Sequence, residues 1–198
     1  MPKIVDHEQR RRELAAAVWR VIDREGVAEV SIRSVAAESG WSSGALRHYF
    51  STRAELLAFA CEQVIDRVSE RIRSLQPAGG PVAAVRAALL ETMPVDDNRR
   101  TEDSIAFSFL ALGLSDPHLA AVQRRHFTEM YGLCRQLVIG LAEHGVLAPA
   151  GEDSETLAHR LHAVVDGLSV QALAGHLTTD EVVGQLDRYL DSLTVSPQ

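Results

Sequence analysis

Between Ser31 and Phe50, two short amphipathic segments meet at a glycine, and this arrangement constrains the fold more than any other feature of the chain. Ser31 is a good N-cap for a helix over residues 32–39, and Gly40 is a natural end for it. The apolar positions of this first segment are Ile32, Val35 and Ala36. A second short helix is predicted over residues 42–49. Two short helices joined by a glycine turn form the helix-turn-helix plan.

Helical periodicity continues along almost all of the chain, and no strand-like alternation runs longer than four residues. The clearest break is the run from Pro77 to Pro81, which contains two glycines. The other predicted helices span about 6–25, 52–75, 82–92, 100–114, 117–144, 154–174 and 180–193. The sequence therefore predicts an all-α fold of about nine helices, with a three-helix domain over residues 1–53 and a larger helical domain over residues 54–198.

Charge is spread unevenly between these two regions. The chain of 198 residues has a formal net charge of −7, which argues against a generic nucleic-acid binder. Residues 1–53 carry nine Lys and Arg against seven acidic residues, so the remaining residues hold a net charge of −9. A mildly basic head on an acidic body suits contact with phosphates at one end only.

Several classes of protein are disfavoured by what the sequence lacks. Cys61 and Cys134 stand outside any metal-ligand spacing and are expected to be buried, reduced thiols, as is usual in the cytoplasm. No signal peptide and no apolar run of about 20 residues is found, so we expect neither secretion nor a membrane span. Glycine-rich phosphate loops and zinc motifs are also missing, and we expect no cofactor, no metal and no enzymatic activity.

The second short helix has the residues that a DNA-reading helix needs. It must enter a major groove roughly 12 Å wide and present its N-terminal residues to the base edges. Small residues over 42–45 allow close approach of the backbone, and Ser42 and Ser43 are suited to phosphates or base edges. Arg47 is long enough to reach a guanine or a phosphate, whereas Leu46 and Phe50 are expected to face inward.

The same stretch resembles the DNA-binding signature of the TetR family of transcriptional regulators, in spacing as well as in residue type. The matching residues are Gly26, Ile32, Val35, Ala36, Gly40, Ser43, Gly44, Leu46, Tyr49, Phe50, Arg53, Leu56 and Leu57. The resemblance implies DNA contacts from the second short helix and phosphate contacts from Tyr49, Arg33 and Arg53. Together with the residue chemistry, it gives as candidate DNA contacts Arg33, Trp41, Ser42, Ser43, Gly44, Ala45, Arg47, His48, Tyr49 and Arg53.

Two of these positions depart from the family pattern. The family usually has a lysine where this chain has Arg53, and the charge is kept. Trp41 stands where smaller residues are common, and two interpretations remain open for it. Its ring either stacks on the sugar-phosphate backbone or shields the turn.

The rest of the chain resembles the regulatory domain of the same family, and residues 163–173 are similar to its BetI-like subgroup, which is named for a repressor of a choline and betaine pathway. The resemblance implies a homodimer formed by the last two helices and a small-molecule effector of unknown identity. The candidate dimer residues are Leu157, Leu161, Val164, Val165, Leu168, Leu173, Val182, Val183, Leu186 and Leu190, although a monomeric core would show the same apolar pattern. The candidate effector-binding residues are Phe107, Leu110, His126, Met130, Tyr131, Cys134, His162 and Asp166. A pocket with Asp166 and aromatic rings would suit a cation.

Three functional hypotheses follow. The first is a dimeric repressor that a small molecule releases from a palindromic DNA operator. The second is a DNA-binding activator or architectural protein without an effector. The third is a helical enzyme or carrier in which the helix-turn-helix is vestigial.

Overall fold

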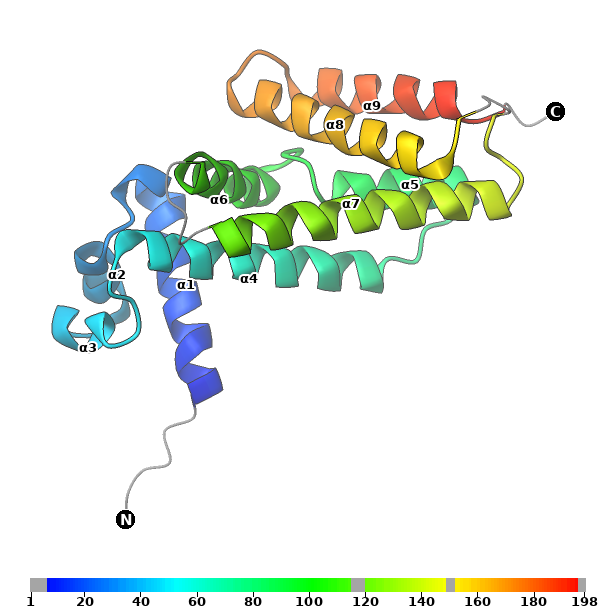
Figure 1. The fold of residues 1–198 in the computed structure, drawn as a ribbon. Helices are drawn as coiled ribbons and strands as arrows, with labels where there is room; N and C mark the ends of the chain where they lie inside the picture. The colour runs from blue at the N-terminus through cyan, green and yellow to red at the C-terminus, as the bar shows by residue number, and fades with distance from the viewer. Residues whose placement is uncertain (1–6, 115–119, 149–151, 196–198) are drawn as a thin grey trace. The chain divides into compact units, whose positions relative to one another are not determined.

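The computed structural model describes residues 7–114, 120–148 and 152–195. Within these ranges the chain forms nine α-helices and one 3-10 helix, and an isolated β-bridge between Leu147 and Thr194 is the only extended pairing (Figure 1). The elements are α1 (His7–Glu25), η1 (Val27–Glu29), α2 (Ile32–Ser39), α3 (Ser43–Arg47), α4 (Arg53–Ser74), α5 (Pro81–Leu90), α6 (Asp97–Gly113), α7 (Ala120–Glu143), α8 (Ser154–Leu173) and α9 (Thr179–Leu193). None of the helices in these ranges is both long and apolar enough to cross a bilayer.

The predicted all-α fold is confirmed, and the helix boundaries follow local capping chemistry. Helix α2 has the predicted bounds, and helices α8 and α9 begin after side-chain caps from Asp153 and Thr178. Helix α6 was expected over residues 100–114 and begins three residues earlier, at Asp97. Helix α3 was expected over residues 42–49 and has α-helical hydrogen bonding only over Ser43–Arg47. The predicted start of α7, at residue 117, lies outside the described residues.

The chain divides into two compact units that are interleaved in sequence. The first unit contains the residues up to Asp66 together with Ser104–Gln123, and the second contains Arg67–Asp103 and the residues from Arg124 onward. Helix α4 therefore begins in the first unit and ends in the second. The boundary predicted after residue 53 separates a DNA-binding domain from a regulatory domain by function, whereas these units are defined by compactness. The functional boundary stays a prediction.

In the first unit, α1 packs on α2 and α2 packs on α3 around a small apolar core. Leu14, Val18 and Val21 from α1 are buried there, as the helical spacing predicted. Leu46 from α3 and Leu56 from α4 are fully buried in the chain as well. Because full burial of a leucine side chain contributes roughly 1.5–3 kcal/mol, Leu46 holds the five-residue α3 against the rest of the molecule.

In the second unit, α8 and α9 lie side by side as an antiparallel pair (Figure 1). Most of the apolar residues that the sequence suggested for a dimer interface are buried inside this single chain. They are Leu157, Leu161, Val165, Leu168, Val182, Leu186 and Leu190. Val164, Leu173 and Val183 are only half-buried. The strongest apolar stripe of each helix therefore forms the core of the unit, and any partner must contact a different face.

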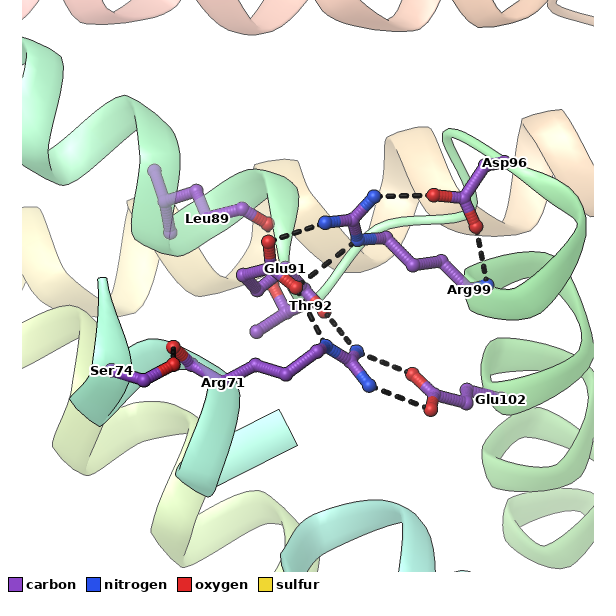
Figure 2. Close-up of polar contacts among 8 residues, drawn as sticks. All are labelled: Arg71, Ser74, Leu89, Glu91, Thr92, Asp96, Arg99 and Glu102. Atoms are coloured by element: carbon purple, nitrogen blue, oxygen red, sulfur yellow. Dashed lines mark hydrogen bonds and ion pairs between the residues drawn. The ribbon is translucent and has the colours of Figure 1, made fainter. Parts of the chain in front are cut away.

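The second unit also contains a network of ion pairs centred on two arginines (Figure 2). The Arg71 guanidinium donates to Glu91 at 2.7 Å and to both carboxylate oxygens of Glu102, at 2.8 and 2.5 Å. Arg99 donates to Glu91 and to Asp96. Both glutamates are buried, so these arginines provide the charge compensation that a buried carboxylate requires. The network links the end of α4 to the α5–α6 connection and to α6.

Candidate DNA-reading surface

Two serine caps and one glycine build the helix-turn-helix locally. The Ser31 side chain accepts a hydrogen bond from the Ser34 backbone N–H, and the Ser34 side chain accepts one from the Ser31 backbone N–H, which together form a capping box at the start of α2. Gly40 ends α2 with φ of 73°, in the left-handed region that favours glycine. The Ser42 side chain then accepts from the Ala45 N–H at 3.1 Å and starts α3. The predicted caps at Ser31 and Gly40 are thus confirmed.

Helix α3 is short, but the chain stays coiled after it ends. His48 N–H donates to Ala45 O at 3.2 Å, and the N–H groups of Tyr49 and Phe50 both donate to Leu46 O, at 2.9 and 3.0 Å. The turn around Leu46 therefore keeps residues 47–49 on one compact surface. The Phe50 ring packs on the ring of Phe59 in α4, with 5.1 Å between centroids, and this contact fixes the exit of the turn.

The predicted DNA-contact residues of α2 and α3 are mostly exposed. The exposed members are Arg33, Ser42, Ser43, Gly44, Arg47, His48 and Tyr49, while Trp41 and Ala45 are half-buried. A Cβ built on Gly44 would meet only the Ser42 hydroxyl, at 3.9 Å, so no side chain projects from α3 at this point and its backbone is open to close approach. A fully buried leucine beneath an exposed basic and polar face is the arrangement that a groove-reading helix needs.

Trp41 connects the beginning of α1 to the end of the reading segment. Its ring lies edge-on to Tyr49, with centroids 5.5 Å apart and an interplanar angle of 68°. The Arg10 guanidinium lies 5.5 Å from the centroid of the Trp41 ring, in cation–π distance. Arg10 is not in the predicted set of DNA contacts. The sequence feature that could have pointed to it is its position as a basic residue near the start of the first helix. These contacts join Arg10, Trp41 and Tyr49 into one cluster.

Arg53 has a set of contacts that the sequence did not indicate. Its Nε donates to Val30 O at 2.8 Å, and its Nη2 donates to Val27 O at 3.0 Å and to Ala28 O at 3.4 Å. The side chain is half-buried, unlike Arg33 and the other exposed candidates. Its guanidinium therefore holds the backbone that connects α1 to α2.

The residues predicted to bind an effector fall in both units. Phe107 and Leu110 belong to the first unit, and the other six belong to the second. Within the second unit, Cys134 is fully buried in the apolar core, and burial raises the pKa of its thiol to about 12. Tyr131 stacks on His159, with centroids 4.3 Å apart, and donates a hydrogen bond to Glu155.

A polar cluster in the second unit contains two of the predicted effector residues and two that were missed, and two of its members, His162 and Ser169, are buried while the other two are half-buried. The cluster consists of Asp103 from α6 and of His162, Asp166 and Ser169 from α8, where the three residues share one helix face. His162 Nε2 lies 3.3 Å from an Asp166 carboxylate oxygen. Asp103 Oδ2, His162 Nε2 and Ser169 Oγ are buried and have no hydrogen-bond partner of good geometry among the described residues. Buried polar atoms without partners are uncommon, because leaving one unpaired costs about 1–3 kcal/mol.

Burial dominates the electrostatics of this cluster. It raises the pKa of Asp103 to about 8, with additional repulsion from Glu102 and Asp166, although the Ser169 hydroxyl opposes the shift. Burial also raises the pKa of Asp166, against the attraction of His162. The ring of Phe127 lies beside His162, with 5.9 Å between centroids. Because the pKa of Asp103 is about 8, this carboxyl group holds a proton for most of the time at pH 7.

Models of protein families match two parts of the chain. A model described as "Bacterial regulatory proteins, tetR family" matches residues 14–59, which contain α2, α3 and Arg53. A second model, described as the C-terminal domain of BetI-type transcriptional repressors, matches residues 81–195.

Curated relatives cover nearly the full length of the chain. The HTH-type transcriptional regulator PksA of Bacillus subtilis is 35% identical over 198 residues, which cover 98% of this chain and 95% of the relative. A BetI transcriptional regulator from Stenotrophomonas maltophilia is 28% identical over 171 residues, and the match covers 85% of this chain and 83% of the relative.

Solved structures resemble the fold as a whole. A transcriptional regulator from Rhodococcus sp. Rha1 has a TM-score of 0.76 and 28% identity, and the match covers 94% of this chain and 99% of that one. A regulator from Saccharomonospora viridis, solved in complex with choline, has a TM-score of 0.76 and 21% identity, with coverage of 96% and 100%.

Proposed function

The chain belongs to the TetR family of DNA-binding transcriptional regulators, and from this premise we propose that it is a homodimeric repressor that a small cationic effector releases from a palindromic operator. The observation that carries the proposal is the exposed basic face of α3 above the buried Leu46, inside the region that the family model matches. The family and the curated relatives are regulators and not enzymes, which disfavours a helical enzyme with a vestigial helix-turn-helix. We place its action in the cytoplasm.

The size of the reading segment argues for two copies. Helix α3 has five residues, and a single helix of that length reaches too few bases for tight and specific binding. Two copies whose reading helices lie about 34–36 Å apart would share a palindrome. A dimer also doubles the contribution of every base contact to operator affinity.

The outer face of α8 supports a dimer contact. Ala163, Gly167, Val170 and Ala174 follow one another at helical spacing on the side opposite the buried stripe. Val170 is exposed although it is large and apolar, and a Cβ built on Gly167 meets nothing within 4 Å. Small residues and an exposed valine allow a partner helix to approach closely, and burying this face would remove apolar surface from water.

We expect the wild-type chain to select a palindromic duplex from a random DNA pool and to bind it as a dimer. Val170→Asp should weaken both dimerisation and operator binding by roughly tenfold or more, because two carboxylates would face each other in the contact. Sedimentation velocity measures the dimer, and fluorescence anisotropy with the selected duplex measures the affinity. Val170→Ala is the matched control and should retain both properties. Recovery of duplexes without two-fold symmetry would contradict the proposal.

The polar cluster defined above, of Asp103, His162, Asp166 and Ser169, supports a cationic effector. The cluster contains two carboxyl groups, one imidazole and one hydroxyl, and the imidazole of His162 lies beside the Phe127 ring. Three of its buried polar atoms make no hydrogen bond of good geometry within the described residues. A cation would pair with the carboxylates and pack against the ring, and so it would satisfy the groups that burial destabilises. The regulator from Saccharomonospora viridis binds choline, and choline is therefore the first probe for this chain. To release DNA, the effector must bind the non-reading conformation more tightly by a few kcal/mol.

We expect affinity for a cationic probe to rise with pH. Cation binding favours ionised Asp103, whereas the pKa of this residue in the empty protein is about 8, so binding must displace a proton at neutral pH. Affinity should increase by up to about tenfold per pH unit below 8 and level off above it. Calorimetric titration with choline at pH 6, 7 and 8, in buffers of different ionisation enthalpy, measures the affinity and the proton release.

Two controls make this result specific. Asp103→Asn removes the titrating group and should abolish the pH dependence. The uncharged choline isostere 3,3-dimethylbutan-1-ol should bind weakly at every pH. Equal binding of the charged and uncharged probes would show that the effector is not selected by charge.

A further inference from the structure

Arg53 is the first residue of α4, and its side chain points back to the connection between α1 and α2. The start of α4 is held by local caps, since the Glu55 N–H donates to the Thr52 hydroxyl at 3.1 Å and the Ser51 N–H donates to the Glu55 carboxylate at 2.6 Å. The backbone from which Arg53 projects is therefore fixed. From there, its guanidinium spans three carbonyl groups of residues 27–30.

Those carbonyls lie directly before the helix-turn-helix. Val27 opens η1, and Val30 adjoins Ser31, the N-cap of α2. Val30 is completely buried, so its position is coupled to the core of the head. A planar guanidinium that donates to several carbonyls at once fixes both distance and orientation. Arg53 thus sets the position of the first turn of α2, which carries the exposed Arg33, relative to the start of α4.

We propose that Arg53 is a positioning residue that aligns the helix-turn-helix for DNA reading, and that it does not act as a phosphate contact. This inference rests on the DNA-binding function above. Two of its guanidinium nitrogens are already engaged by backbone carbonyls, and the side chain is half-buried. For this role the hydrogen-bond geometry of the arginine is the essential property, and its positive charge is secondary.

The two roles make opposite predictions for Arg53→Lys. A phosphate contact needs only positive charge, so the lysine variant would bind the selected operator like the wild type. A positioning role needs the guanidinium geometry, so the lysine variant should lose operator affinity by about tenfold or more, nearly as much as Arg53→Met. The matched control is Arg73→Lys, because Arg73 is exposed on the same helix and its Nε donates to Ser69 O in its own helix.

The salt dependence of binding and the discrimination between DNA sequences separate the two roles further. For a positioning residue, the slope of log affinity against log salt stays at the wild-type value in both variants, and the ratio of operator to random-sequence affinity falls. A lost phosphate contact would lower this slope by about 0.9 for each subunit of the dimer, and it would weaken binding to the operator and to the random-sequence duplex equally.

Each outcome decides the question. Wild-type affinity in Arg53→Lys, or a lowered salt slope in Arg53→Met, overturns the proposal. Loss of helical circular dichroism in Arg53→Lys also overturns it, in favour of a role in folding. If Arg53→Met does not fold, comparison of Arg53→Lys with Arg73→Lys is sufficient. Failure of the wild type to bind any duplex would instead count against the proposed function itself.

Discussion

Replacing Arg71 with methionine is expected to lower the free energy of unfolding by about 2–4 kcal/mol. The substitution removes the partner of Glu102 and one of the two partners of Glu91, and the side chains of these glutamates are only 5% and 10% exposed. Breaking a fully buried ion pair costs about 3–5 kcal/mol. We expect a smaller loss for Arg71→Met because the Arg71 side chain is 35% exposed. Chemical unfolding followed by circular dichroism measures the change.

A second ion pair in the same unit provides the control. Arg86 and Asp187 join α5 to α9, but both side chains are 40% exposed. Arg86→Met should therefore cost no more than about 1 kcal/mol. Adding Glu102→Gln to Arg71→Met should restore part of the lost stability, because it removes the unpaired charge. A similar small loss in Arg71→Met and Arg86→Met would contradict the distinction between the two pairs.

The effect of Arg71 should also depend on pH. Burial alone would raise the pKa of Glu91, but hydrogen bonds from Arg99 and Arg71 outweigh it, and the net shift is downward. A depressed pKa in the folded state gives stability that is present at neutral pH and is lost as the pH falls through that pKa. The difference between wild type and Arg71→Met is therefore largest near pH 7 and shrinks in acid, where Glu91 becomes protonated.

Local chemistry explains why much of the fold was predictable from sequence. Ser31 and Gly40 specify their ends of α2 through a cap and a left-handed φ, and neither requires knowledge of the tertiary structure. The end of α3 was less predictable, because residues 48 and 49 keep helix-like hydrogen bonds to the preceding turn after the regular helix ends. Residues 48 and 49 therefore fit both a longer helix and a turn that follows a shorter one.

Side-chain contacts between distant segments could not be predicted in the same way. Arg53 contacts carbonyls 23 to 26 residues before it, and no periodic pattern encodes this separation. The proposed dimer face of α8 was obscured for another reason. Its core stripe, which contains Leu161 and Val165, is more apolar than its outer face, so a hydrophobic pattern identifies the core first. Asp103 was missed because a single acidic residue in a helix gives no sign of its burial.

The second large effect is expected from Arg47→Ala, which should lower operator affinity by about 2–6 kcal/mol per dimer, or roughly thirtyfold and more. Arg47 is the only basic residue within α3, and its side chain is exposed beside the buried Leu46. A guanidinium at this place is suited to paired hydrogen bonds with a guanine, each worth about 1–3 kcal/mol of discrimination, and the dimer loses two of them. Anisotropy titrations with the selected operator and with a random duplex measure both affinities.

Arg33→Ala is the control that separates base reading from phosphate contact. Arg33 is also exposed but lies in the first turn of α2, and removing a phosphate contact weakens all DNA sequences alike. Arg47→Ala should therefore reduce the ratio of operator to random-duplex affinity, while Arg33→Ala lowers both affinities and leaves that ratio unchanged. If Arg47→Ala weakens both duplexes equally, Arg47 contacts the backbone, and sequence must be read by the other exposed residues of the segment. Ser42, Ser43 and His48 would then be the next candidates for substitution.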